Sequence, residues 1–307
     1  MLNTEIAQSK EDEKSNYYIG MGGWDIPSFY EYFYPSKMQK GFHRLEYYSR
    51  FFDIVEVNST FYTSELSPAM AYRWLKDVEN NNRFVFAVKL FKGFTHSFTA
   101  TEKDVNAINS FLKPLRETKK LVGLVIQFPS SYFRTEERQN YIIKLRNTFM
   151  DDKVFLDLRH RTWNSEKTYK MCEDYKMNLI NVDLPPLPNH MPLNAKTWDG
   201  VAYFRMMGRN ARDWNNFTNN NRYLYHYSKQ ELDNLVEKIR QANGKKTYII
   251  FHNDKLASSI ANAFELKHRL YPNKQYFVPA KLLIKFPQIK EFCKPIEKKS
   301  DNKNDII

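Results

Sequence analysis

Cysteine is scarce in this chain of 307 residues, which contains only Cys172 and Cys293. The two lie far apart and lack metal-site spacing, so the sequence indicates neither a disulfide framework nor a thiolate zinc site. Glycine is also scarce, and the cluster Gly20, Gly22 and Gly23 matches neither the dinucleotide-binding pattern nor the Walker pattern. A tight turn is expected there. No GxSxG nucleophile elbow occurs either.

Long apolar runs are missing as well. No stretch approaches the roughly 20 residues that a membrane-spanning helix needs. The polar segment 1–16 lacks the apolar core of a signal peptide. We therefore expect a cytoplasmic protein that does not enter a membrane.

The composition instead favours one globular domain. Apolar residues make up 42% of the chain and aromatic residues 16%, which supplies ample core material. We predict a single domain over residues 17–293, a flexible N-terminal tail over 1–16 and a polar C-terminal tail over 294–307. The net charge is +12, but residues 267–307 hold ten Lys or Arg against four Asp or Glu, so about half of the excess lies in that segment.

Eight short apolar runs, each ending in polar residues and followed by a helical pattern, dominate the sequence. They are residues 17–24, 53–61, 83–90, 121–129, 154–160, 178–185, 200–209 and 247–254. Parallel strands need long crossovers, and a closed barrel leaves no exposed edges. The sequence therefore predicts an α/β fold: a TIM-like barrel of eight parallel strands, with its site at the carboxyl ends of the strands.

Two insertions interrupt this rhythm. Residues 184–200 are rich in proline, and residues 210–227 are rich in asparagine, arginine and aromatic residues. Both follow strands, so we expect irregular long loops after strands six and seven that lie over the barrel mouth. Helix signals are clearer elsewhere: Ser228 and Glu231 form a capping-box pattern, and Pro68 opens another helix.

Glu56 is the first candidate for chemistry. Val55 and Val57 suit a buried strand, so Glu56, Asn58 and Thr60 alternate with them and should point into the barrel. A buried carboxylate is costly unless it is paired. It is interpreted either as part of a structural network or as a general acid or base.

The segment Asp157-Leu158-Arg159-His160 is the densest cluster of polar side chains. Alternation places Asp157 and Arg159 on one face, so the arginine can neutralise the aspartate and still offer its fork to a carboxylate or phosphate. His160 begins the loop. It is either a structural histidine or a proton shuttle beside Asp157.

Several cations predict an anionic or polyhydroxylated ligand. Lys89 ends the third strand, where it can bind an anion or, if desolvated, act as a nucleophile. Arg205 and Arg209 flank Met206-Met207-Gly208 in the seventh run. We expect these side chains to bind the ligand.

Other polar residues at strand ends give weaker signals. They are His96, Gln127, Asp183, His252, Asn253 and Asp254. Pooled with Glu56, Asp157 and His160, some could coordinate a divalent metal, but no HxH or HExxH spacing supports this. We predict no metal and no cofactor.

Distinctive blocks occur in a fixed order along the chain. They are GGW, VEVNSTFY, FAVKLFKGFTH, LVIQFP, LRHRTW, VDLPP, YFRMMGR and FHND. This order, from about Tyr18 to Leu270, resembles the YecE-like family, a domain of unknown function (DUF72). The resemblance implies a TIM-like barrel without an established activity. It also implies the following mouth residues: Trp24, Glu56, Asn58, Thr60, Tyr62, Lys89, Thr95, His96, Gln127, Arg159, His160, Trp163, Asp183, Arg205, Gly208, Arg209, Asn253 and Asp254.

The chain departs from the usual family pattern at three places. Asp157 stands where the carboxylate before LRH is usually glutamate. Met207 stands where the usual HGR has histidine, and His252 stands where the usual FNN has asparagine. A mechanism that depends on the missing histidine is therefore not supported here.

The leading hypothesis is a hydrolase or isomerase acting on a small sugar-like or phosphorylated molecule. Glu56 with Asp157 or His160 would handle protons, while the cations would hold the ligand. Trp24, Tyr62, Trp163 and Trp214 would either form walls or belong to the core. The alternatives are a protein that binds nucleic acid or processes a phosphodiester, and a non-catalytic interaction scaffold. The sequence does not decide the oligomeric state.

Overall fold

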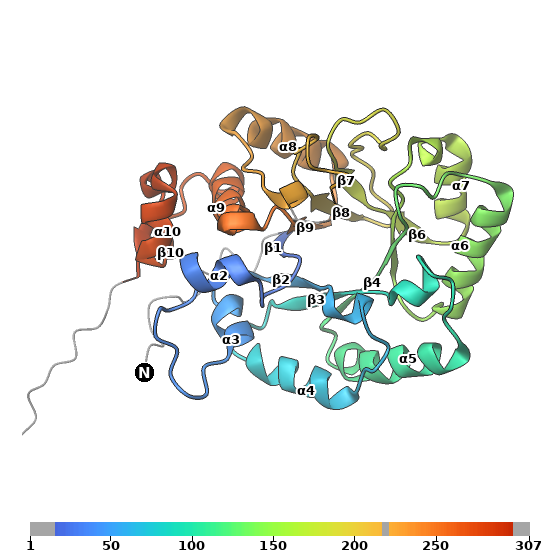
Figure 1. Cartoon of the computed structure of the whole chain (residues 1–307), viewed down its shortest axis with the longest axis horizontal. Helices are drawn as coiled ribbons and strands as arrows, with labels where there is room; N and C mark the ends of the chain where they lie inside the picture. Colours follow the sequence, from blue (N-terminus) through green and yellow to red (C-terminus); the bar gives the residue numbers. More distant parts are fainter. Residues whose placement is uncertain (1–15, 217–220, 297–307) are drawn as a thin grey trace, which may run out of the picture.

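The computed structural model describes residues 16–216 and 221–296. The predicted N-terminal tail, apart from its last residue, lies outside the described residues, as does the predicted C-terminal tail from residue 297 onward. The last described strand, β11 (Cys293–Pro295), extends past the boundary expected at residue 293. Helices surround the strands in Figure 1.

Nine parallel strands form the main sheet. They are β1 (Tyr17–Met21), β2 (Ile54–Val57), β3 (Val85–Lys89), β4 (Leu121–Gln127), β5 (Val154–Asp157), β6 (Met177–Leu179), β7 (Asn181–Asp183), β8 (Val201–Met206) and β9 (Lys246–Phe251). Their order is β6-β5-β4-β3-β2-β1-β9-β8-β7. Each of the eight predicted runs overlaps at least one of these strands.

The two ends of this order are consecutive pieces of one run. β6 pairs with β5, β7 pairs with β8, and only Ile180 separates β6 from β7. The amide of Ile180 still donates to the Leu156 carbonyl at 2.8 Å. The sixth run therefore joins both neighbours in turn and brings the ends of the sheet together. The predicted TIM-like fold is confirmed, with the sixth run split into two strands.

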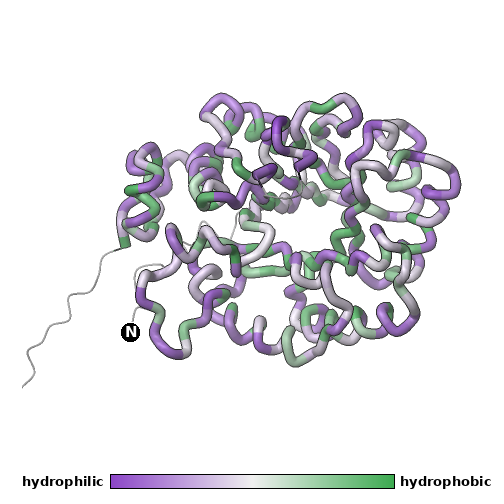
Figure 2. The backbone as a smooth tube through the Cα atoms, viewed as in Figure 1, coloured by the Kyte–Doolittle hydropathy of each residue, from purple (hydrophilic) through white to green (hydrophobic). Residues whose placement is uncertain are grey.

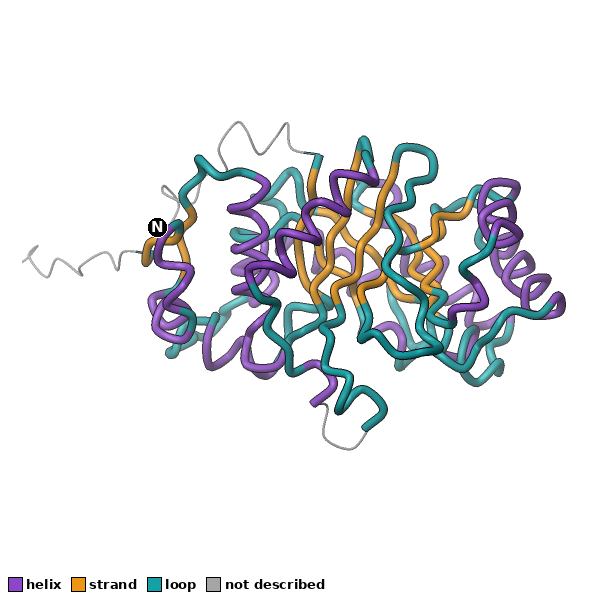
Figure 3. The backbone as a smooth tube through the Cα atoms, turned by 90° about the horizontal axis from the view of Figure 1, so that it is seen from above, coloured by secondary structure: helices purple, strands orange, loops and turns teal. Residues whose placement is uncertain are grey.

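Helices follow most strands and pack outside them. They are α2 (Pro27–Tyr32), α3 (Arg44–Ser49), α4 (Pro68–Asp77), α5 (Glu102–Glu117), α6 (Glu136–Thr148), α7 (Glu166–Asp174), α8 (Lys229–Ala242), α9 (Ser258–Leu270) and α10 (Ala280–Lys285). The view from above shows the strands side by side in the middle, with helices on both flanks (Figure 3). As predicted, Pro68 opens α4 and a capping box from Ser228 to Glu231 opens α8.

The barrel wall separates two apolar layers. The larger lies between strands and helices and includes Phe86, Phe204 and Phe264. The smaller lies inside the barrel and includes Ile54, Val125 and Phe155. Within a strand, every second side chain points to this interior side. Hydrophobic colours concentrate along the inner strands in Figure 2, and hydrophilic colours along the outer helices. The interior is thus a packed core below the mouth.

A tyrosine hydroxyl bridges β1 and β2. Tyr48 of α3 accepts a hydrogen bond from the Met21 amide at 2.8 Å and donates one to the Ile54 carbonyl at 2.9 Å. Gly20 pairs with Ile54 in this seam, and a Cβ on Gly20 would come within 1.8 Å of the Ile54 carbonyl oxygen. Glycine is required there because the two backbones approach so closely.

The loops after the sixth and seventh runs carry no α-helix among their described residues, as expected. Beyond α9, β10 (Tyr276–Val278) pairs in parallel with β11, and α10 lies between them in sequence. Among the described residues, no helix combines the length and apolar character needed to cross a bilayer.

Candidate active site

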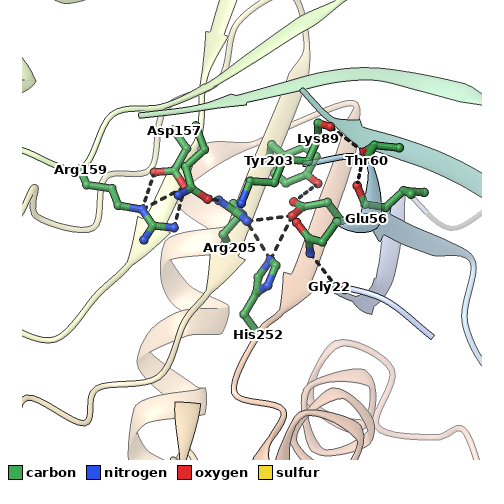
Figure 4. Close-up of polar contacts among 12 residues, drawn as sticks. Gly22, Glu56, Thr60, Lys89, Asp157, Arg159, Tyr203, Arg205 and His252 are labelled. Carbon is green, nitrogen blue, oxygen red and sulfur yellow. Dashed lines mark hydrogen bonds and ion pairs between the residues drawn. The ribbon is translucent and has the colours of Figure 1, made fainter. Parts of the chain in front are cut away.

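Arg205 of β8 lies at the centre of a buried hydrogen-bond network inside the barrel. Its side chain is 1% exposed. Nη2 donates to Glu56 Oε1 at 2.8 Å, and Nη1 donates to Gln127 Oε1 at 3.0 Å and to Asp157 Oδ2. Nε donates to His252 Nε2 at 3.2 Å. One side chain therefore connects four other strands or strand ends (Figure 4).

We call this cluster the interior network. Its members are Glu56, Lys89, Gln127, Asp157, Arg159, Tyr203, Arg205 and His252. Seven of them stand two positions after a residue of the interior apolar cluster, and these cluster residues are Ile54, Ala87, Val125, Phe155, Val201, Tyr203 and Ile250. Because alternate strand residues share a face, an apolar layer lies beneath the polar one. The predicted interior direction of Glu56 and Asp157 follows from this alternation.

The carboxylates of the network are held in the ionised form. Tyr203 donates its hydroxyl to Glu56 Oε2 at 2.8 Å, and Arg205 satisfies the other oxygen. Burial alone would raise the pKa of Glu56, but Arg205, His252 and Lys89 together outweigh burial and the pKa is lowered. Burial opposes Arg159 and Arg205 in the same way at Asp157, whose pKa is also lowered. Near neutral pH both groups can accept a proton but have none to donate.

Arg159 forms the outer edge of the network. Its Nε and Nη2 donate to Asp157 at 3.1 to 3.2 Å, as the sequence predicted. Its side chain is 10% exposed, compared with 1% for Arg205. Among the described residues no acceptor meets its Nη1, so this atom can donate to a ligand. Arg205 was expected to hold ligand as well, but four of its five N–H groups already serve protein acceptors.

Lys89 is the buried amine of the network. Its Nζ lies 3.9 Å from the centroid of the Phe61 ring. Among residues 16–216 and 221–296 it has no carboxylate oxygen within 4.0 Å. Burial and the positive charge of Arg205 lower the pKa of Lys89 to about 7. A substantial share of this side chain is therefore neutral at physiological pH.

This amine predicts a pH dependence of stability. An unfolded lysine titrates near 10.4, whereas Lys89 in the folded protein titrates near 7. Between these values the unfolded chain binds a proton that the folded chain lacks. The free energy of unfolding should fall as the pH is lowered from about 10 to 7, by up to about 1.4 kcal/mol per pH unit. Below this window the contribution of Lys89 is constant.

Urea unfolding at about pH 7, 8 and 9 measures this slope. Lys89→Met should flatten the slope relative to the native chain. Lys92→Met is the matched control, because Lys92 is exposed and follows Lys89 by three positions. Equal slopes for the native protein and Lys89→Met would contradict the assignment.

His252 completes the network as a neutral ring. Because its Nε2 accepts from Arg205, its proton lies on Nδ1. Burial and Arg205 lower the pKa of His252 to about 4. The ring fits because Gly22 has no side chain: a Cβ there would come within 2.3 Å of Nδ1. Asn58 also lies beside Gly22 and donates to its carbonyl at 2.7 Å.

The loops after β2 and β3 place the remaining candidates around Phe61. Thr60 is fully buried and donates to the Lys89 carbonyl at 2.6 Å, so it supports the backbone. The ring of His96 contacts Phe61, with centroids 4.9 Å apart, and burial lowers its pKa to about 4. Tyr62 is 71% exposed. His96 is thus the second neutral imidazole near Lys89.

His160 lies away from the interior network. Its Nδ1 is 2.9 Å from Thr162 Oγ1 and accepts from the Thr162 amide at 3.3 Å, whereas Asp157 faces Arg159 and Arg205. His160 instead lines a cavity of about 510 Å³. The other lining residues are Ser130, Ser131, Phe133, Leu187, Pro188, Asn189, His190 and Asn215. They follow β4, β5, β7 and β8, so the cavity lies on the mouth side and has the size of a small-molecule pocket.

Asp183 and Arg209 form a separate outer network. Arg209 donates to Asp183 through Nε and Nη2 at 2.8 to 3.1 Å. The Tyr227 hydroxyl donates to Asp183 at 2.6 Å and accepts from the Gly208 amide at 2.9 Å. Val182 belongs to the interior layer, so its neighbour Asp183 faces the other side of the wall. These residues fasten the loop after β8.

The residues after β9 extend this anchoring. Asn253 donates to the Tyr225 carbonyl at 3.0 Å and to Asn262 at 2.8 Å. Asn262 of α9 is fully buried and donates to the Tyr227 carbonyl at 3.1 Å. Asp254 differs from its neighbours, because burial raises its pKa to about 7 and its Oδ1 is buried without a partner among the described residues.

The tryptophans that the sequence suggested as wall or core residues all pack against other aromatic rings. Trp163 is fully buried, donates from Nε1 to the Tyr132 carbonyl at 2.6 Å and stacks on that ring. Trp24 packs edge-on against Trp74. Trp214 is buried beside the ring of His190. The core interpretation fits Trp163 best.

The model of the family described as "Protein of unknown function DUF72" matches residues 18–283. The chain belongs to the DUF72 family. The resemblance drawn from the sequence blocks is thereby confirmed.

DUF72 relatives cover most of the chain. The UPF0759 protein YunF of Bacillus subtilis is 27% identical over 257 residues, which span 77% of this chain and 88% of YunF. A DUF72 protein of Thermotoga maritima has 28% identity and a TM-score of 0.73, covering 83% of this chain and 99% of that one. A DUF72 protein of Enterococcus faecalis has 25% identity and a TM-score of 0.72, covering 83% and 95%.

The three residues that depart from the DUF72 pattern have different surroundings in the structure. His252 enters the interior network beside Glu56, with 3.3 Å between Nε2 and Oε1. Met207 is buried with Trp214 in the apolar interior cluster, so it adds no polar group there. Asp157, shorter than the usual glutamate, still reaches both arginines.

No cluster of three or more His, Cys, Asp or Glu suited to a metal occurs within the described part of this DUF72 chain. The carboxylates and His252 of the interior network face arginine donors instead.

Sequence reasoning missed two tyrosines of the DUF72 site. Tyr203 supports Glu56, and Tyr227 supports Asp183. Tyr203 stands two positions before Arg205 on the same strand. That spacing was an available signal for its interior direction, but its hydroxyl partner lies on a strand 147 positions away.

Proposed function

We propose that this protein is an enzyme that acts by acid/base chemistry on a small anionic or hydroxylated molecule at the barrel mouth. The observation that carries the proposal is the interior network. Two guanidiniums, Arg159 and Arg205, face two carboxylates, Glu56 and Asp157, in the barrel interior. An apolar filling would stabilise a purely structural barrel at least as well. Perturbed ionisable groups at strand carboxyl ends are typical of catalytic sites.

Binding and proton transfer fall to different residues in this proposal. Arg159 offers a spare donor to an anionic or hydroxyl group of the ligand. Lys89 and Asp254 titrate near neutral pH and can exchange protons. Glu56 and Asp157, being ionised, act as bases or stabilise positive charge that develops on the ligand.

A substrate screen tests the proposal. It should cover sugar phosphates, other phosphate esters and short single-stranded oligonucleotides. Once turnover is found, Glu56→Gln should lower kcat by about a hundredfold or more, because it removes the buried charge with little change in volume. Arg159→Met should mainly raise KM.

Asp151→Asn is the control for the carboxylate changes, because Asp151 is exposed. The control should leave turnover unchanged. If folded Glu56→Gln keeps native kcat and KM, the network is not the catalytic centre. Turnover or tight, salt-sensitive binding restricted to oligonucleotides would favour the nucleic-acid alternative instead.

A further inference from the structure

Lys89 is a basic side chain of the interior network that forms no ion pair among the described residues. It ends β3 on the interior face, beside Arg205 and Glu56 (Figure 4). Its side chain is buried, with 9% of the residue exposed. As the last residue of β3, it stands at the carboxyl end of the strand, which is the mouth side of a parallel barrel.

The charges around Lys89 disfavour an ammonium ion. Glu56 and Asp157 are already matched by Arg205 and Arg159. An ammonium at Lys89 would therefore be a third cation facing two carboxylates in a buried space. The cation–π contact with the Phe61 ring offsets only part of the cost of burying an unpaired ammonium. The free amine leaves the network balanced, in agreement with the lowered pKa of about 7.

A free, partly accessible amine has a lone pair that an ammonium lacks. We propose that Lys89 forms a covalent imine with the carbonyl carbon of a small aldehyde or ketone that also carries an anionic or hydroxyl group. This inference rests on the proposed function, since the ligand would occupy the same mouth. It narrows the substrate class to carbonyl compounds.

The reaction balances without a further reagent. Lys89 Nζ attacks the carbonyl carbon, a C–N bond forms, and a proton moves from nitrogen to the carbonyl oxygen. A second proton, taken up from solution, converts that hydroxyl into leaving water, the C–O bond breaks, and a protonated imine remains. The anionic group of the ligand balances its positive charge, because Arg205 and Arg159 already match the charges of Glu56 and Asp157. His96, which is neutral and contacts the same Phe61 ring, can relay a proton through water.

Reductive trapping tests the imine directly. The full chain is incubated at neutral pH with pyruvate, glyoxylate or dihydroxyacetone phosphate, together with sodium cyanoborohydride. Intact-mass measurement counts the adducts, and peptide mapping locates them. At neutral pH, a pKa near 7 leaves about a thousandfold more free amine than an ordinary lysine has. We therefore expect at least about tenfold greater modification at Lys89 than at any other lysine.

Two variants and one control keep the test sharp. Lys89→Met removes the amine without adding a buried charge, and Lys89→Arg keeps a cation that cannot form an imine. Both should lose the adduct at residue 89, while Lys92→Arg should retain it. Circular dichroism verifies that each variant is folded. Even labelling across surface lysines, or no adduct at Lys89 with any of the three probes, would overturn the inference.

Calorimetry without reductant separates this inference from the proposed function. If these probes, or ligands found in the substrate screen, bind to both the native protein and Lys89→Met while no adduct forms, the imine is wrong and the mouth is still a ligand site. If nothing binds, turns over or is trapped, both proposals fail. A Lys89 adduct that saturates with probe concentration supports both.

Discussion

Replacing Arg205 with methionine is expected to destabilise the protein by about 3 to 5 kcal/mol, because it leaves Glu56 and Asp157 buried without their shared partner. Methionine approximates the length of the side chain, so lost packing contributes less than lost charge pairing. The loss is large compared with the total stability of a typical domain, which is about 5 to 15 kcal/mol. Urea unfolding at neutral pH measures it.

A compensated variant isolates the electrostatic cause. Adding Glu56→Gln and Asp157→Asn to Arg205→Met removes the stranded charges and should restore much of the lost stability. Arg73→Met is the surface control, since Arg73 is exposed on α4, and it should change stability by less than about 0.5 kcal/mol. A loss below about 1 kcal/mol for Arg205→Met would mean that the network contributes little to folding.

Gly20→Ala should also be severe, at about 3 kcal/mol or more, for a steric reason. The new Cβ would lie 1.8 Å from the Ile54 carbonyl oxygen and 2.8 Å from the Tyr48 hydroxyl. Because the nearest of these atoms belongs to backbone, β1 and β2 must move apart. The Tyr48 bridge between Met21 and Ile54 would break with them.

Gly41→Ala supplies the comparison. Gly41 has φ +86°, but nothing lies within 4 Å of a Cβ there. Its cost should be limited to backbone strain, about 1 to 2 kcal/mol. Urea unfolding of the two variants should therefore rank Gly20→Ala as the more damaging. The reverse order would show that the β1–β2 seam relaxes easily.

The fold was predictable because its signal is local. Each strand is a short apolar run, and the change from an apolar run to a helical pattern recurs along the chain. The split of the sixth run was not predictable. Ile180 marks the point where hydrogen bonding changes from β5 to β8, and this depends on how the barrel closes rather than on the run itself.

For the site, the sequence predicted only which side chains of a strand point into the barrel. Glu56 stands out as a charge between valines, and alternation then gives its side. Asp183 shows the same local pattern, a charge between the apolar Val182 and Leu184, but these two face the interior and Asp183 belongs to the outer network. The local pattern alone therefore does not tell which side a charged residue faces. The partner of Glu56 is Arg205, 149 positions away, and only barrel closure brings them together.

Because guanidiniums and carboxylates are equal in number around Lys89, ligand binding should be accompanied by the uptake of a proton. A ligand that brings one negative charge into this balanced space favours protonation of Lys89, and an imine formed there is itself a cation. In either case the complex takes up a proton from solution near neutral pH. The measured heat of binding would then change with the ionisation enthalpy of the buffer, and affinity would weaken as the solution becomes more alkaline.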